Sequence, residues 1–260
     1  MKTKIPKRKL QYIRIFSPTW ESGPHSEAFT SVAMRFALKL AEDCAYRFGD
    51  FNCLDIHLTP AAADGAIKIW DEKWEPWAQH IDLGCPLEML LKADDNQATN
   101  IIANALLELA SMLSAQTQPI EAVRAELIAN GADTIIWMKS KRVERKRYTI
   151  APYFKVKGLR PDFVQVFVRL IEPARKTSEQ SGETFKDYLV IETDDLEAFS
   201  LVGSISLKGD RLFVFPKTSA QGEASAQAYK SRGFSLPIEV PVSLSWKGPR
   251  VEQLRLPIEF

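Results

Sequence analysis

The sequence predicts an α+β protein, in which an N-terminal α/β region is followed by a mostly antiparallel, β-rich region. Up to residue 131, segments with a strand period of two alternate with segments that have the helical period of 3.6. From residue 132 onward the period of two dominates, in short segments separated by turn residues. With 45% hydrophobic and 26% charged residues in 260, the composition is typical of a globular protein.

The N-terminal region is predicted to begin with a strand, a helix and a second strand. Residues 9–16 alternate between polar and apolar side chains, and turn residues follow them. The helix starts near Ser26, a favoured N-cap residue, and ends before Gly49. Residues 51–58 form the second strand. If the two strands are parallel, the three elements form a right-handed crossover.

Two further helices are predicted to cover the sheet of this region. The first runs from about residue 94 to residue 113, and Asp94 and Asp95 complement the positive end of its dipole. The second begins at Pro119, a residue that favours the first turn of a helix, and ends before Gly131. Each helix has one apolar face, which is expected to pack against the sheet.

The C-terminal region is predicted to consist mainly of strands. They occupy residues 133–141, 146–157, 162–171, 186–193, 200–207, 211–216 and 238–246. Long polar connections lie at 172–186 and 216–237, and the second contains a candidate helix at 223–230. No Pro- or Gly-rich linker separates the regions, so the predicted domains, 1–131 and 132–260, can share one continuous core.

Charge is distributed unevenly along the chain, although the formal net charge is only +1. Residues 41–130 contain fifteen acidic and five basic residues, which gives a net charge of −10. Residues 139–160 contain nine basic residues and one glutamate, which gives a net charge of +8. Such an asymmetry produces long-range fields that attract charged partners. The acidic region favours a basic protein as its partner.

No segment of the sequence predicts a membrane span or a targeting signal. The most apolar run, residues 101–113, is interrupted by Asn104 and Glu108 and is shorter than the roughly 20 residues of a transmembrane helix. The basic N-terminus is not followed by an apolar stretch with a cleavage site. The three cysteines fit no disulfide framework and are expected to be reduced. We expect a cytoplasmic protein.

The segment IWDEKWEPWAQH, residues 69–80, combines tryptophans with acidic residues. Pro76 opposes one continuous helix through this segment, because proline removes a backbone hydrogen bond, and it is expected to open a short helix instead. Tryptophan is enriched at binding hot spots, and flanking carboxylates suit a basic partner. The predicted partner-binding residues are Trp70, Asp71, Glu72, Trp74, Glu75 and Trp77. The alternative is that the indole rings lie in the core and the carboxylates are merely solvated.

The sequence favours a protein without enzymatic activity, cofactor or bound metal. HExxH and paired CxxC metal-binding motifs, GxSxG, GxGxxG and GxxxxGK[ST] are all missing. One pattern is compatible with catalysis, since metal-dependent nucleases of the PD-(D/E)xK kind hold a cation with two acidic residues beside a lysine. In this alternative the catalytic residues are Asp55, His57, Asp71 and Lys73, but Pro76 soon follows and disturbs the expected strand.

The basic segment at 139–160 is compatible with nucleic-acid binding. The cations that would neutralise phosphates are Lys141, Arg142, Arg145, Lys146 and Arg147. On a hairpin with a period of two, however, the charges lie on the solvated face while Tyr148, Tyr153 and Phe154 lie on the core face. This arrangement leaves few rings available for stacking on bases.

Charge and the missing motifs together favour a binding protein that engages a basic protein, such as an immunity protein that neutralises a cognate toxin. Electrostatic attraction would bring the partner close, and the indole rings would anchor it. A metal-dependent nuclease or phosphoesterase is the alternative function, and a nucleic-acid-binding module is the third.

Overall fold

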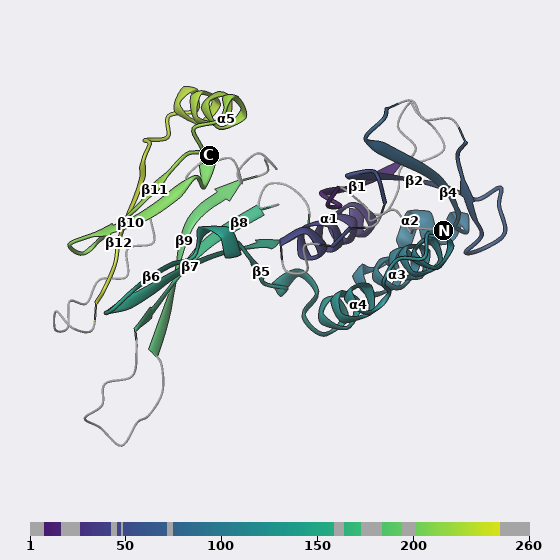
Figure 1. Cartoon of the computed structure of the whole chain (residues 1–260), viewed down its shortest axis with the longest axis horizontal. Helices are drawn as coiled ribbons and strands as arrows, with labels where there is room; N and C mark the ends of the chain where they lie inside the picture. The colour runs from purple at the N-terminus through teal and green to yellow at the C-terminus, as the bar shows by residue number, and fades with distance from the viewer. Residues whose placement is uncertain are drawn as a thin grey trace, which may run out of the picture. The chain divides into compact units, whose positions relative to one another are not determined.

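The computed structural model describes residues 8–16, 27–42, 46–47, 49–71, 75–158, 164–172, 184–193 and 201–244. The chain divides into two compact units (Figure 1). Unit 1 consists of Met1–Trp137 with Lys155–Arg160, and unit 2 of Met138–Phe154 with Pro161–Phe260. The strand-helix-strand beginning and the later antiparallel sheets confirm the predicted α+β class. The domain boundary after residue 131 stays a prediction, because a compact unit is not by itself an independently folding domain.

Unit 1 combines a mixed sheet with a group of helices. Its strands are β1 (Tyr12–Phe16), β2 (Cys53–Thr59), β3 (Ile67–Ile69), β4 (Ala78–Gly84) and a short β5 (Ile136–Trp137). Its helices are α1 (Glu27–Glu42), α2 (Leu87–Lys92), α3 (Asp95–Met112) and α4 (Gln118–Asn130), followed by the 3-10 turn Gly131–Asp133. The sheet has the order β1-β2-β4-β3, in which β1, β2 and β4 are parallel and β3 is antiparallel to β4. Parallel pairing of β1 with β2 fulfils the condition set for the predicted crossover.

The helices cover one face of this sheet (Figure 1). Successive side chains of a strand point to opposite faces, so each strand contributes every second residue to the core. The strand residues in the core are Ile13, Leu54, Ile56, Leu58, Ile81 and Leu83. The helices contribute residues such as Phe29, Phe36, Leu40, Ile102, Leu106 and Leu109. The opposite face of the sheet therefore carries the other set of side chains.

Local sequence explains where the longest helix begins and where its neighbour ends. The Asp94 carboxylate accepts a hydrogen bond from the Gln97 backbone N–H at 2.8 Å, and the Gln97 side chain accepts one from the Asp94 N–H at 3.0 Å. This capping box satisfies two N–H groups at the start of α3, as expected from Asp94. Gly131 follows α4 with a φ of 51°, a conformation that glycine adopts without steric cost.

A buried arginine joins the late segment of unit 1 to its helices. Arg35 of α1 donates from Nε to the Val156 carbonyl at 2.9 Å and from Nη2 to the Lys157 carbonyl at 3.0 Å. Its Nη1 lies 2.6 Å from the Asp95 carboxylate at the start of α3. Because an unpaired buried charge is costly, these three partners hold residues 156 and 157 against the helical layer.

Unit 2 is built mainly from antiparallel strands. They are β6 (Val143–Arg145), β7 (Tyr148–Val156), β8 (Val164–Glu172), β9 (Thr184–Thr193), β10 (Ser204–Lys208), β11 (Arg211–Phe215) and β12 (Ile238–Pro241). β7, β8 and β9 are neighbours in one sheet, with β6 pairing with β7, and β10-β11-β12 form another. The pairs β6/β7, β8/β9, β10/β11 and β11/β12 are antiparallel. The candidate helix at 223–230 is confirmed as α5 (Ala220–Ser231).

Two local predictions were wrong. Residues 78–84 form the central strand β4, although Pro76 was expected to open a short helix. β4 lies between β2 and β3, and six of its seven residues are buried. Its sequence alternates at His80-Ile81-Asp82-Leu83, but Pro76 stands two residues before it and favoured a helix start. The strand predicted at 133–141 is reduced to β5, because 3-10 turns occupy Gly131–Asp133 and Lys139–Lys141.

Candidate functional site

The sheet face opposite the helices carries a row of polar side chains across three strands. Arg14 of β1 is paired in register with Asp55 of β2, and Asp55 is paired with His80 of β4. Because the three strands are parallel and in register, the three side chains lie on the same face at the same level. We call this side of the unit 1 sheet the polar face. It is the one place where β1, β2 and β4 all contribute ionisable or hydrogen-bonding groups at the same level among the described residues.

Asp55 is the centre of this row. Its side chain is 0% exposed, and its two oxygens accept hydrogen bonds from Arg14 Nε at 2.7 Å and Nη2 at 2.6 Å. The Cys53 thiol donates to the same carboxylate at 3.3 Å, and His80 Nδ1 lies 3.5 Å from it. A bidentate guanidinium is the strongest common partner for a carboxylate, so it compensates the desolvation of Asp55. The hydrogen bonds that Arg14 donates to Asp55 raise the pKa of Arg14 above its ordinary value.

Arg14 connects this buried centre to the solvent-accessible part of the polar face. Its side chain is 42% exposed and its Nη2 lies 3.6 Å from the Glu75 carboxylate. The guanidinium carbon lies 5.4 Å from the centroid of the Trp77 ring and 5.6 Å from that of Phe16. These distances are in the range of cation–π contacts. One cation therefore organises a carboxylate and an indole from the tryptophan-rich segment.

A stack of aromatic rings stands beside this row. The rings of Phe16 and His57 are stacked with centroids 4.9 Å apart, and those of His57 and Trp70 with centroids 4.5 Å apart. Trp70 Nε1 donates to the Asp82 carboxylate at 2.8 Å, which fixes the indole. The two faces of the His57 ring are thus occupied by neighbouring rings. The His57 ring is therefore not available to stack on the ring of a ligand.

The two histidines of the polar face are coupled. His57 Nε2 and His80 Nδ1 are 3.2 Å apart, a hydrogen-bond distance in which one nitrogen donates and the other accepts. Burial lowers the pKa of His57, and the proximity of His80 lowers it further. His57 is therefore mainly neutral at pH 7.

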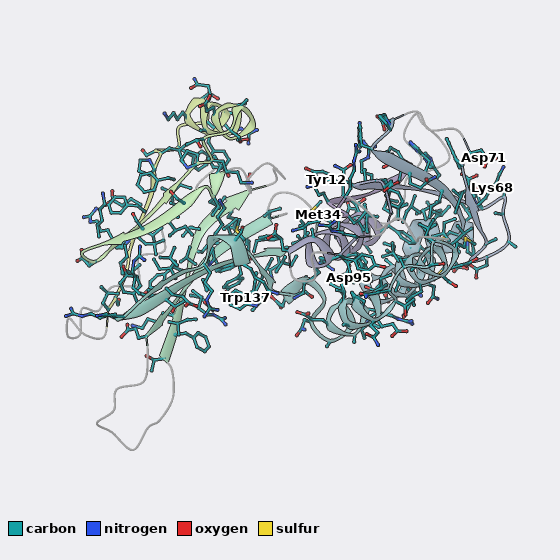
Figure 2. All side chains as sticks on the ribbon, in the orientation of Figure 1. Tyr12, Met34, Lys68, Asp71, Asp95 and Trp137 are labelled. Atoms are coloured by element: carbon teal, nitrogen blue, oxygen red, sulfur yellow. The ribbon has the colours of Figure 1, made fainter. Side chains whose placement is uncertain are left out.

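Several residues of the predicted partner-binding surface lie at this face. Trp70, Glu75 and Trp77 are half-buried and contact the polar row or the stack as described above, whereas Asp71 is exposed. Figure 2 shows Lys68 and Asp71 at the β3 edge of the sheet, with Tyr12 on β1. Glu72 and Trp74 lie outside the described residues. Whether this surface binds a partner stays a prediction.

The residues of the alternative, catalytic interpretation are only partly brought together. Asp55 and His57 share one face of β2, as their spacing predicted. Asp71 follows β3 and is exposed, and Lys73 lies outside the described residues. Sequence reasoning missed Arg14, because a single arginine in an alternating strand has no signature until the strand register is known. A further signal was available in His80 and Asp82, two residues apart like Asp55 and His57.

Three side chains of the polar face are arranged like ligands of a metal ion. Single ligand atoms of Asp55, Glu75 and His80 lie within 4.8 Å of one another. Carboxylates and imidazole are common zinc ligands. Both oxygens of Asp55 are, however, already bonded to the Arg14 guanidinium. An ion would have to displace this cation or share the carboxylate with it at close range, which like charges oppose.

The thiol of Cys53 is a poor nucleophile in this environment. Burial raises its pKa to about 12, and the negative charge of Asp55 contributes to the rise. Because the thiolate is the reactive form, the thiol is inert at neutral pH. Cys85 is also buried, and burial raises its pKa to about 11. Neither Cys53 nor Cys85 forms a disulfide among the described residues, and Cys44 lies outside them, so the reduced state of the three cysteines stays a prediction.

Comparisons of the chain with protein-family models, curated proteins and solved structures gave no match. Inferences about function therefore start from the polar face and from charge. Among the described residues, no helix has the length and apolar character needed to cross a membrane.

Proposed function

We propose that the protein is a non-enzymatic binding protein whose unit 1 docks a basic protein partner on the polar face of its sheet. The observation that carries this proposal is the position of Arg14. The buried Asp55 holds the guanidinium in place, and the half-buried Trp77 and Glu75 lie beside it. The Glu75 side chain is 40% exposed. Arginine and tryptophan dominate binding hot spots, and a surface already held in one conformation loses little entropy on binding.

The charge of residues 41–130 supports a basic partner. This segment, with its net charge of −10, belongs to unit 1, whose other residues bring the formal net charge of the unit to −2. The charge of Arg14 itself is neutralised by Asp55, so the carboxylates of the exposed Asp71 and the half-buried Glu75 contribute the negative field at this surface. A negative field of this kind accelerates the encounter with a cationic protein and disfavours anionic ones.

The chemistry of the polar face favours binding over catalysis. Asp55 is engaged by Arg14, His57 by His80, and the Cys53 thiol is protonated at neutral pH. A general base or nucleophile must instead be free to reach the reacting atom of a substrate. These groups hold each other in place, and their role in the proposal is to fix the surface.

The finer form of the proposal is an immunity protein that blocks the active site of a basic toxin. Nucleic-acid-directed toxins carry cationic surfaces, and an acidic protein covering such a surface excludes the nucleic acid by occupying the same charges. This form accounts for the combination of the acidic segment 41–130 with an anchor of indole and guanidinium groups.

The test uses the protein encoded by the reading frame next to the gene for this chain, which the proposal expects to be basic. We expect a 1:1 complex by light scattering, and calorimetry at 100 mM salt should show that Trp77→Ala weakens binding at least tenfold. Glu75→Gln should weaken it less. The matched control is Glu144→Gln, the same charge change on unit 2, which should leave the affinity unchanged.

Two outcomes contradict the proposal. One is a neighbouring product that is acidic or does not bind this chain. The other is an equal weakening of the complex by Glu144→Gln and Trp77→Ala. For the immunity form, expression of the neighbouring product alone should stop cell growth, and coexpression of this chain should restore it. The Trp77→Ala variant should then restore growth less well at equal protein level.

A metal-dependent nuclease or phosphoesterase is the second candidate, favoured by the proximity of Asp55, Glu75 and His80. This function predicts that Zn²⁺ or Mn²⁺ binds to the purified protein with one ion per chain, and that nucleic acid or a phosphate ester is cleaved only when the ion is present. Asp55→Asn should abolish both. If calorimetry shows no binding of either ion at millimolar concentration, this candidate is excluded.

A further inference from the structure

The hairpin formed by β6 and β7 presents a concentrated positive charge at its tip. Arg145 of β6 is paired in register with Tyr148 of β7, so Lys146 and Arg147 form a two-residue loop. Arg142, Arg145, Lys146 and Arg147 are all exposed. The single acidic residue among them, Glu144, is paired with Arg142 Nε at 2.9 Å. The cations beyond Arg142 face no carboxylate within their own hairpin.

The residues of the loop are not those that a two-residue hairpin loop favours. Such loops prefer Asn-Gly, Asp-Gly or Gly-X, because the favoured turns need positive φ angles. Among the described non-glycine residues only Ser114 has a positive φ, so Lys146 and Arg147 make the turn without one. Two adjacent like charges at this tip therefore do not serve the turn. A residue choice that opposes local folding preference is typical of a functional site.

The aromatic side chains of this region are only partly accessible to the solvent. Tyr153 and Phe154 of β7 are buried, but as neighbours in a strand they point to opposite faces and do not share the predicted core face. Tyr148, also expected on the core face, is half-buried beside the tip. The tip thus offers exposed guanidinium and ammonium groups, whereas its nearest ring is partly covered. Single-stranded nucleic acids are usually bound by exposed rings together with cations. The composition of the tip therefore favours binding to the phosphate backbone of a duplex over binding to the bases of a single strand.

The tip also lacks the apolar side chains that insert into a lipid surface. The large exposed apolar residues of the described chain all lie elsewhere, in β1, α2, β9 and the helical ends at Met112, Leu113 and Ile128. Three of the four exposed cations are arginines, whose planar guanidinium binds phosphate through two parallel hydrogen bonds. The major groove of B-form DNA accommodates a two-stranded β-ribbon between its phosphate backbones.

We propose that the tip of the β6–β7 hairpin, formed by Arg142, Arg145, Lys146 and Arg147, binds the phosphate backbone of double-stranded DNA. This binding site lies in unit 2 and is independent of the partner-docking function proposed for unit 1. Most of the affinity comes from release of counterions, since the tip has no ring or carboxamide that would read a base edge. Binding is consequently insensitive to DNA sequence and strongly dependent on salt.

The experiment measures fluorescence anisotropy of a labelled 20-base-pair duplex with the full-length protein at several salt concentrations. Neutralisation of about four phosphates predicts a slope of log K against log salt of about −3.6. In the triple variant Arg145→Gln, Lys146→Gln, Arg147→Gln the slope should fall to about −1, since three contacts are removed. Affinity at 50 mM salt should fall at least tenfold.

The matched control removes three exposed cations of unit 2 that belong to β9, β10 and α5 rather than to the hairpin. In the variant Lys186→Gln, Lys208→Gln, Lys230→Gln the net charge changes by the same amount, and the slope should stay near its wild-type value. Equal loss in both variants would mean that net charge rather than the hairpin attracts the DNA, which overturns the proposal. Absence of duplex binding at 50 mM salt overturns it as well.

Two further measurements distinguish the source of the anion and exclude unfolding. Tighter binding to a single strand of the same length, or to vesicles with 30% phosphatidylserine, would contradict the assignment to duplex DNA. The variant Lys146→Asn, Arg147→Gly introduces the residues that a two-residue loop favours. It should unfold at the same or a higher temperature than the wild type and still lose duplex affinity, so a loss cannot be attributed to a damaged fold.

Discussion

The polar face of unit 1 and the tip of the β6–β7 hairpin both concentrate charge, but they use it in opposite ways. On the polar face, Arg14 is bonded to a carboxylate that is completely buried, so its charge is neutralised and its position fixed. At the hairpin tip, Lys146 and Arg147 extend into solvent, and their charge acts over a distance. Paired charges thus build a rigid surface for close contact, whereas unpaired charges attract a distant polyanion.

The largest expected effect is the loss of the guanidinium from the polar face. Arg14→Met leaves the Asp55 carboxylate buried without its cation, and we expect the free energy of unfolding to fall by about 3 kcal/mol. Urea denaturation followed by tryptophan fluorescence measures this change. The matched control is Arg211→Met, since the Arg211–Glu239 pair of unit 2 is exposed and its loss should change the stability much less. Equal losses in the two variants would remove the distinction between the two uses of charge.

Replacing Arg14 with lysine sharpens the same comparison. An ammonium group keeps the positive charge but cannot make two parallel hydrogen bonds to Asp55. We therefore expect Arg14→Lys to destabilise unit 1 by less than Arg14→Met, by about 1 to 2 kcal/mol. If Lys and Met variants unfold at the same urea concentration, shape rather than charge holds the row together.

The pH dependence of stability should separate the two units. All three histidines of the chain belong to unit 1. The pKa of His57 is lowered in the folded state, so the unfolded chain binds the proton more readily. The stability that depends on neutral His57 is complete above pH 6.5 and decreases as the pH falls below it. His57→Phe, which keeps a ring in the stack, should show a weaker decrease between pH 7 and pH 5.5 in thermal melts.

The labelling rate of the Cys53 thiol reports whether Cys53 and Asp55 stay buried in solution. With its pKa at about 12, the thiol should react with iodoacetamide at pH 8 more than tenfold slower than the same thiol in the urea-unfolded chain. Peptide mass spectrometry resolves Cys53 from the other cysteines. Rapid native labelling would contradict the buried row, and labelling that is faster only in Arg14→Met would show that the guanidinium keeps it closed.

The smallest expected effect concerns an exposed ion pair of unit 1. Hydrogen bonds from Lys157 and Lys155 lower the pKa of Asp133 to about 2. The stability from this pair is present above the ordinary pKa of about 3.8 and is lost as the pH falls toward 2. Because the carboxylate is 66% exposed, Asp133→Asn should cost less than about 1 kcal/mol at pH 7 in urea denaturation. A larger cost would show that solvent screens this pair little.

The fold was predictable where local signals agree with tertiary structure. The strands at both ends of α1 alternate in the expected manner, and Asp94 marks the start of α3 by a capping box. β4 was missed because it begins two residues after Pro76, which favours the first turn of a helix, although His80-Ile81-Asp82-Leu83 alternates like a strand. Its polar residues, such as His80 and Asp82, are tolerated since Asp55 and Trp70 lie beside them. Such partners become visible only with the sheet order.

The site was predictable in part for the same reason. The spacing of Asp55 and His57 places both on one face of a strand, and the tryptophan-rich segment supplies Trp70 and Trp77. Arg14 lies 41 positions before Asp55, and no pattern within either strand indicates that they pair. Register between strands is a long-range property, which single-sequence periodicity does not contain.

The contacts of Arg35 have a consequence for dissecting the protein. Its two carbonyl acceptors come from residues 156 and 157, which belong to unit 1 although residues 138–154 belong to unit 2. A truncation after residue 137 would delete both acceptors and leave a guanidinium with a dry environment and one remaining anion. Neither unit can therefore be expressed intact by cutting the gene once. An isolated unit 1 needs residues 155–160 restored through an engineered linker.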